Sequence, residues 1–177
     1  GCFRFLERAY SQPIHIYQYA LSNHEGVIGM EHANDAIPNQ GASLITGEKS
    51  ATRKHASKNG AAEILEVQVR KLDSFALENI GLIKIDAEGE ETNVLEGAEN
   101  TLKKYRPVLL IEIEQRHREG DIYNVFQQIE SLGYQGEFLL GDNFQPLSAF
   151  SVAGHQQARL AGDKTKPYIN NFVFRPA

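Results

Sequence analysis

Four acidic side chains stand at the ends of two short apolar segments of the sequence. Asp86 and Glu88 follow the first segment, and Glu112 and Glu114 close the second. Carboxylates on neighbouring strands lie close enough to raise each other's pKa, to share a proton or to bind a hard cation. An acid that ends a buried strand costs desolvation free energy unless something pairs with it. Asp86 is therefore predicted to touch a ligand or a reacting group.

The charged side chains around these acids have a structural interpretation beside the chemical one. His117 follows the second segment and could act as a general base near neutral pH, although an exposed loop histidine is the simpler interpretation. Glu88 and Glu91 could belong to the acidic site or could offset the dipole at the start of a helix. Lys84 interrupts the first segment, and we expect a structural role for it, in a buried ion pair or with its ammonium group reaching the strand edge.

Such a site needs a scaffold that brings the ends of two strands together. The apolar segments 82–86 and 108–113 predict buried strands, and a helical pattern over 94–102 lies between them. A second helix is predicted to begin after Asp121, its capping residue, and to end at Gly133. Strands that alternate with helices through short connections predict an α/β fold with a mostly parallel sheet, in which ligands bind at the carboxyl ends of the strands.

The rest of the sequence supplies further strands and one long loop. We expect a short helix at 2–10 and strands at 14–20, 65–69, 136–140 and 171–174. The segment 31–62 is poor in apolar residues and rich in Gly, Asn, Ser, Thr and Lys, which predicts a flexible loop that contains a short hairpin. With 177 residues, 41% of them hydrophobic, the chain 1–177 is predicted to form a single domain.

Composition argues against several classes of protein. The net charge of -5 and the lack of a Lys/Arg block disfavour a nucleic-acid-binding surface. No apolar run approaches the ~20 residues of a membrane-spanning helix, and no signal-peptide pattern is present. Cys2 is the only cysteine and the histidines lack ligand spacing, so neither a disulfide nor a dedicated metal site is expected. These features favour a soluble, cytoplasmic protein.

An ordered set of short motifs resembles the FkbM-type methyltransferase family. The motifs are Leu72-Asp73-Ser74-Phe75, Lys84-Ile85-Asp86-Ala87-Glu88-Gly89-Glu90-Glu91, Val94-Leu95-Glu96-Gly97-Ala98, Arg106-Pro107 and Glu112. The core of the match covers about 72–114, and Ala20-Leu21-Ser22 resembles an earlier segment of the family. The resemblance implies a Rossmann-like fold that uses S-adenosylmethionine to methylate a hydroxyl of a sugar, glycolipid or natural product.

The resemblance also suggests which residues form the site. It places Asp86 near the methyl donor and the acceptor, and Ala20, Leu21 and Ser22 near the adenine. With the acid and histidine singled out above, the catalytic candidates are Asp86, Glu112 and His117. The cofactor-binding candidates are Ala20, Leu21, Ser22 and Asp86, and the acceptor is expected to be a small-molecule or glycan hydroxyl.

The sequence departs from the family pattern before Ile14. A complete domain of this kind first presents a strand, a glycine-rich turn that opens a helix, and a second strand that ends in an acid. We expect the fold to lack this strand-helix-strand unit, which would split the sheet between the strands at 14–20 and 82–86. Exposed edges would then favour a homodimer, and the chain could be inactive alone. Two other functions stay open: a non-enzymatic scaffold or interaction module, and a metal-dependent hydrolase that uses the four carboxylates.

Overall fold

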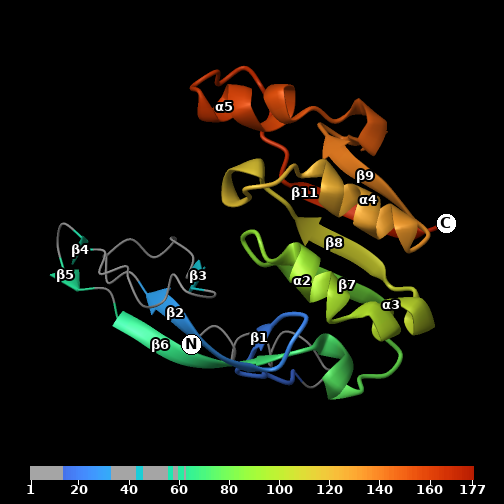
Figure 1. The fold of residues 1–177 in the computed structure, drawn as a ribbon. Coiled ribbons are helices and arrows are strands. Elements are labelled where there is room, and N and C mark those ends of the chain that lie inside the picture. The colour runs from blue at the N-terminus through green and yellow to red at the C-terminus, as the bar shows by residue number, and fades with distance from the viewer. Residues whose placement is uncertain (1–13, 33–42, 46–55, 58–59, 62) are drawn as a thin grey trace.

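The computed structural model describes residues 14–32, 43–45, 56–57, 60–61 and 63–177. These residues form an α/β fold with two main sheets, which lie beside each other in Figure 1. The predicted helix at 2–10 lies outside the described residues, as does most of the predicted loop at 31–62. Within that loop, β4 (Ala56–Ser57) and β5 (Gly60–Ala61) pair antiparallel, which confirms the expected short hairpin.

The first sheet has four strands in the order β1-β6-β2-β3. They are β1 (Ala20–Leu21), β6 (Glu63–Arg70), β2 (Gly26–His32) and β3 (Ser43–Ile45). β1 pairs parallel with β6, whereas β2 runs antiparallel to both β6 and β3. The strand predicted at 14–20 is wrong except for Ala20, which lies in β1; Tyr17 and Tyr19 pack edge-on against the Phe75 ring.

The second sheet has five strands in the order β10-β9-β11-β8-β7. They are β10 (Asn143–Pro146), β9 (Tyr134–Leu140), β11 (Asn171–Pro176), β8 (Val108–Glu112) and β7 (Leu82–Asp86). β7 and β8 are parallel, and every other pair in this sheet is antiparallel. The expectation of a mostly parallel sheet is therefore wrong. The crossover helices are present, but the last strand returns between β8 and β9 and runs against both.

The helices that join these strands cover one face of the second sheet (Figure 1). They are α2 (Glu91–Glu96), α3 (Glu99–Tyr105) and α4 (Tyr123–Ser131). The core between helices and sheet is apolar and aromatic, with the rings of Phe126 and Phe172 4.8 Å apart. Asp121 accepts a hydrogen bond from the Tyr123 amide at the start of α4, and Gly133 ends it with a φ of 82°, as predicted.

Short helical turns complete the described chain. They are η2 (Leu72–Phe75), η3 (Gln115–His117), η4 (Leu147–Ala149), the π-helix η5 (Ala153–Gln157) and α5 (Ala158–Leu160). Among the described residues, no helix is long and apolar enough to cross a membrane.

The single helix predicted over 94–102 is two helices, α2 and α3, that meet at Gly97. A Cβ at Gly97 would lie 2.0 Å from the carbonyl oxygen of Ser22, so only glycine allows this close approach. Asn23 adds hydrogen bonds to Asn93 and Glu96 on α2. These contacts fix the first sheet beside α2, while β1 and β7 remain edge strands of separate sheets. Whether a missing unit separates them stays a prediction.

Candidate functional site

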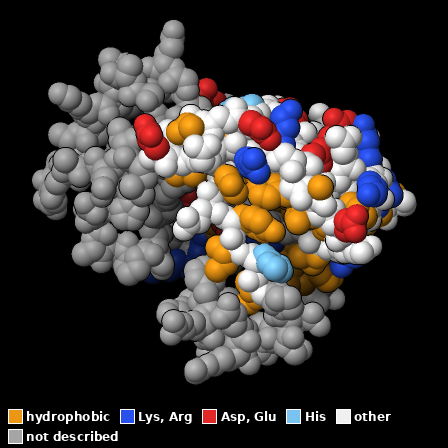
Figure 2. All heavy atoms as spheres, turned by 90° about the horizontal axis from the view of Figure 1, so that it is seen from below, with side chains coloured by type: hydrophobic (Ala, Val, Ile, Leu, Met, Phe, Trp, Pro, Cys, Tyr) orange, Lys and Arg blue, Asp and Glu red, His pale blue; other side chains and the backbone are white. Residues whose placement is uncertain are grey.

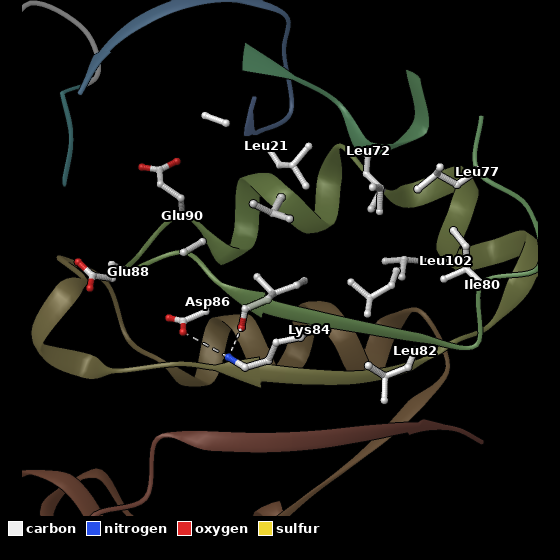
Figure 3. A pocket seen from close by; sticks show the side chains of 16 residues that line it. Leu21, Leu72, Leu77, Ile80, Leu82, Lys84, Asp86, Glu88, Glu90 and Leu102 are labelled. Atoms are coloured by element: carbon white, nitrogen blue, oxygen red, sulfur yellow. Dashed lines mark hydrogen bonds and ion pairs between the residues drawn. The ribbon is translucent and has the colours of Figure 1, made fainter. Parts of the chain in front are cut away.

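A cavity of about 710 Å³ lies between the edges of the two sheets, which is within the usual range for a small-molecule site. Its walls come from β1, η2, β7 and the helices α2 and α3 (Figure 3). Figure 2 shows the molecule from below the view of Figure 1. Hydrophobic side chains gather near the middle of the face seen there, among scattered charged side chains. The lining residues are Ala20, Leu21, Leu72, Leu77, Ile80, Leu82, Ile83, Lys84, Ile85, Asp86, Ala87, Glu88, Glu90, Val94, Ala98 and Leu102.

The two ends of the cavity differ in polarity (Figure 3). Asp86, Glu88 and Glu90 gather at the end that lies beyond the carboxyl end of β7. Aliphatic side chains, among them Leu72 and Leu82, line the opposite end. The cavity therefore suits a ligand with an apolar part and a cationic or hydroxyl-rich part.

Lys84 lies between these ends and reaches back to its own strand. Its Nζ is 3.5 Å from the carboxylate of Asp86 and donates a hydrogen bond of 3.1 Å to the carbonyl of Ile85. The predicted buried ion pair is wrong, because the pair with Asp86 is exposed to solvent. The side chains of Lys84 and Asp86 keep 38% and 55% of their exposure, so the pair adds little to stability.

The turn from β7 into α2 is held by a buried ion pair. Glu91 is 1% exposed, binds Arg118, and accepts a hydrogen bond of 2.8 Å from the Gly89 amide. Glu91 thus has the structural role that the sequence left open. Glu88, at the mouth of the cavity, has a φ of 45°, an uncommon conformation for a residue with a side chain that often marks functional turns.

Glu112 is the register partner of Asp86 across β7 and β8, so both side chains point to the same face of the sheet. Burial raises the pKa of the Glu112 carboxyl, and the charge of Asp86 raises it further, while Lys84 opposes this. Asn170 donates a hydrogen bond of 2.7 Å to Glu112. The Glu112 carboxyl is therefore a stronger base than an ordinary glutamate.

Glu114 lies two residues further along and is buried. It accepts hydrogen bonds from Arg116 and from Asn170, the latter at 2.9 Å. Burial alone would raise the pKa of Glu114, but these hydrogen bonds outweigh it and lower the pKa. His117 faces this carboxylate, with Nε2 3.4 Å from Glu114.

Gln156, in the π-helix η5, joins the end of β8 to the segment that carries Asn170. Its side-chain amide is 1% exposed and donates to the carbonyls of Ile113 and Ile169, both at 2.9 Å. Its oxygen accepts from the Gln115 amide, also at 2.9 Å. A buried amide with these three bonds fixes Asn170 beside the two acids.

Comparison with known families decides the relationship of the chain. The model of the Methyltransferase FkbM domain matches residues 3–135, which is more than half of the chain. The chain belongs to the FkbM methyltransferase domain family. The family that the sequence motifs resemble is thereby confirmed.

The FkbM domain is also similar to a protein of known structure. The crystal structure of Methyltransferase FkbM from Methylobacillus flagellatus KT is similar, with 22% sequence identity and a TM-score of 0.41. The alignment covers 62% of this chain and 23% of that chain, so the chain spans about a quarter of that protein. No curated protein sequence matches the chain.

The FkbM domain brings some of the predicted site residues together and leaves others apart. Ala20, Leu21 and Asp86 line the same cavity. Ser22 is 4% exposed and packs its backbone against Gly97 instead of lining the cavity. Glu112 and His117 also lie outside the lining: Glu112 is on the neighbouring strand, and the carbonyl of His117 packs against Gly89.

Three further residues position this site, and sequence reasoning did not assign them a role. Asn170 and Arg118 contact acids that are far away in the sequence. Asp73 accepts hydrogen bonds from the first turn of α3, including one of 2.9 Å from the Thr101 amide, and so fixes η2 against that helix. The Leu-Asp motif was a usable signal for Asp73, because aspartate is a preferred partner of free amides at helix starts. Within the described part of the chain, no three His, Cys, Asp or Glu side chains are arranged to hold a metal ion.

Proposed function

We propose that the FkbM domain is an S-adenosylmethionine-dependent methyltransferase that methylates a hydroxyl of a small-molecule or glycan acceptor. One observation carries this proposal. Ala20, Leu21 and Asp86, expected near the cofactor from separate motifs more than sixty positions apart, line one cavity of about 710 Å³.

The chemistry of the lining fits this cofactor. S-adenosylmethionine has an aromatic adenine with apolar faces, a ribose with two hydroxyls, a cationic sulfonium, and an amino-acid end that carries an ammonium and a carboxylate. Leu21 and Leu72 offer the apolar wall that the adenine needs, and Asp86, Glu88 and Glu90 offer acceptors for hydroxyls and cations. When bound, the cofactor supplies an activated methyl group.

The residues of the chain have two tasks in this reaction: to position the acceptor and to take its proton. Asp86 lines the acidic end of the cavity, and Glu112, its register partner on β8, lies beside Asp86 but outside the lining. Because the pKa of Glu112 is raised, its carboxylate is a stronger base than an ordinary glutamate and is suited to accept the hydroxyl proton. Asp86 would hold the acceptor in line, which accounts for much of the rate in such displacements. His117 is the second candidate base, within reach of Glu114.

Calorimetric titration of the chain with S-adenosylhomocysteine tests the cofactor site. We expect saturable binding that Asp86→Ala weakens and that Asp142→Ala, a change in the exposed turn between β9 and β10, leaves unaltered. A screen of sugar and natural-product hydroxyls with S-adenosylmethionine would then identify the acceptor. Absence of binding at millimolar ligand would contradict the proposal and would leave a scaffold on the same fold.

The homodimer expected from the exposed sheet edges is part of the same proposal. β1 and β7 are edge strands among the described residues, and edge strands favour association. Sedimentation equilibrium of the chain, with and without S-adenosylhomocysteine, measures it directly. A single monomeric species at high micromolar concentration would exclude the dimer.

A further inference from the structure

Asn170 joins Glu112 and Glu114 through a single nitrogen atom. Its Nδ2 donates hydrogen bonds of 2.7 Å to Oε1 of Glu112 and of 2.9 Å to Oε1 of Glu114. A primary amide nitrogen carries two hydrogens, so each acid receives one of them. Both donors of the Asn170 side chain are therefore used on these two acids, whose pKa values are shifted in opposite directions.

The hydrogen bonds of the Asn170 amide favour one of its two possible orientations. Asn171 donates a hydrogen bond of 3.0 Å to Oδ1 of Asn170. The reverse orientation would turn Oδ1 toward two carboxyl groups and would set the Asn171 donor against an NH₂ group, so both contacts would become repulsive. Asn171 is exposed, and its side chain can therefore be changed without disturbing the core.

The backbone around Asn170 is held by hydrogen bonds to two other parts of the fold. The carbonyl of Asn170 accepts a hydrogen bond of 2.7 Å from the Ile113 amide, and the Ile169 amide donates one of 2.8 Å to the carbonyl of His155. The buried side chain of Gln156 donates to the Ile169 carbonyl at 2.9 Å. Asn170 thus reaches the acids from a support made by η5 and the end of β8, which preorganises its side chain.

The lack of charge on Asn170 matters for Glu112. A lysine or arginine at this position would also supply several donors, but its positive charge would stabilise the ionised carboxylate and lower the pKa of Glu112 much further than an amide does. With a neutral donor, burial and the charge of Asp86 keep the pKa of Glu112 raised. Glu114 accepts the same kind of amide bond but also binds Arg116, and its pKa is lowered.

We propose that Asn170 is the positioning residue of the base Glu112: its amide holds Oε1 and so directs Oε2 to the proton of the acceptor hydroxyl. This inference rests on the proposed function, because it gives Asn170 a part in the proton transfer. A carboxylate with one oxygen fixed has lost its freedom to rotate, so its second oxygen meets the hydroxyl in one direction. The bond to Glu114 ties the same amide to a buried anion and keeps it from following the acceptor.

Asn170→Leu tests the inference, because leucine has nearly the shape of asparagine and carries no donor. We expect kcat for methyl transfer to fall by about 10- to 100-fold, the effect of a misplaced catalytic group, while the Kd for S-adenosylhomocysteine stays the same. Asn143→Leu, the same change at an exposed position of β10, is the control and should leave both constants unaltered. An unchanged kcat in folded Asn170→Leu would overturn the inference.

The pH dependence of kcat distinguishes positioning from a general loss of structure. The ionised form of Glu112 loses a hydrogen bond in Asn170→Leu, so its pKa should rise and the acidic limb of the profile should move to higher pH. The other charged or titratable groups near the two acids are Asp86, Lys84, Arg116, His117 and Tyr168. Asn170→Leu leaves all of these groups in the chain. A lower kcat with an unmoved acidic limb would mean that Asn170 has a structural role alone, and would overturn the inference.

Asn171→Ala keeps the inference testable if Asn170→Leu does not fold, as judged by circular dichroism. It removes the donor that orients the Asn170 amide, from an exposed position. We expect the same changes at smaller size: a loss of about two- to threefold in kcat and a smaller movement of the acidic limb to higher pH. If Asn170→Leu does not fold and Asn171→Ala keeps the kcat and the pH profile of the unmodified chain, the inference is wrong.

Carboxyl-carbon NMR separates this inference from the proposed function, because it needs neither cofactor nor acceptor. The hydrogen bond from Asn170 lowers the pKa of Glu114, so Asn170→Leu should raise it. Unmoved pKa values of Glu112 and Glu114 would overturn the inference, whether or not the chain is active. If the NMR shifts appear but the unmodified chain transfers no methyl group, the proposed function fails, and the part of Asn170 in proton transfer fails with it. If the unmodified chain is active and Asn170→Leu is equally active, the inference alone fails.

Discussion

Glu112 and Glu114 are two residues apart, accept hydrogen bonds from the same Asn170 amide, and have opposite pKa shifts. Burial and the neighbouring charge of Asp86 raise the pKa of Glu112. The pKa of Glu114 is lowered because hydrogen bonds from Asn170 and Arg116 outweigh the effect of its burial. The side chain of Glu114 is only 4% exposed, so burial by itself does not decide the direction of a shift.

The difference separates two uses of a carboxylate within one strand end. Glu114 is a fixed anion that holds Arg116, His117 and Asn170 in place. Glu112 lies beside another acid, and its pKa is raised although Lys84 opposes the shift, whereas the pKa of Glu114 is lowered. The first arrangement serves structure, and we propose that the second serves proton transfer.

The largest expected effect is on catalysis. Glu112→Gln should lower kcat by about 10²- to 10⁴-fold, the usual contribution of a general base, while the Kd for S-adenosylhomocysteine stays the same. The measurement is a methyl-transfer assay with the acceptor found in the hydroxyl screen. If Glu114→Gln lowers kcat as much as Glu112→Gln in folded protein, the division of roles between the two acids is wrong.

The next effect is on stability, where the substitution of Glu114 should have a larger effect than that of Glu112. Glu114→Ala should lower the free energy of unfolding by about 2 kcal/mol, because charge-assisted hydrogen bonds to a buried carboxylate are lost. Glu112→Ala should cost less. Urea denaturation measures both, and Glu99→Ala, which breaks the exposed pair with Lys103, is the control with an effect within about 0.5 kcal/mol.

Much of the scaffold that carries these acids could be predicted from the sequence. β7 has the predicted bounds, and β8 ends one residue earlier than predicted, because unbroken apolar runs are a strong local signal. The break at Gly97 could not be predicted, because it depends on Ser22, which comes close only in the folded chain. The antiparallel course of β11 depends on strand order, which local patterns do not encode.

The hydrogen-bond and ion-pair partners of the acids could not be predicted either, because they are far from the acids in the sequence. Asn170 and Glu112 are 58 positions apart, and Arg118 and Glu91 are 27 apart. An Asn or an Arg in a polar segment looks like a solvated side chain until the fold brings it to a carboxylate. The motif positions therefore located the cavity, whereas the division of roles between Glu112 and Glu114 needed the structure.

The pH dependence of thermal stability should have opposite signs for substitutions of Glu112 and Glu114. Glu112 has a raised pKa in the folded protein, so its contribution is present below the ordinary value of about 4.3 and is lost as the pH rises. Glu114 has a lowered pKa, so its contribution is present above that value and is lost as the pH falls. Relative to the unmodified chain, the Tm of Glu112→Gln should rise with pH and that of Glu114→Gln should fall. If the relative Tm of both variants changes with pH in the same direction, the opposite pKa shifts of Glu112 and Glu114 are wrong.

The smallest effect concerns the charges that set the pKa of Glu112. Removing the negative neighbour with Asp86→Asn should lower this pKa, and removing the positive neighbour with Lys84→Met should raise it. Side-chain carbon NMR of the Glu112 carboxyl measures the shift without any assay of activity, and the Glu99 carboxyl, exposed on α3, is the internal reference. Opposite movements would show that the charges of Asp86 and Lys84 on β7 tune the pKa of Glu112 on β8. Movement in the same direction would mean that the two substitutions act through a change in burial, and Glu112 would then owe its raised pKa to desolvation alone.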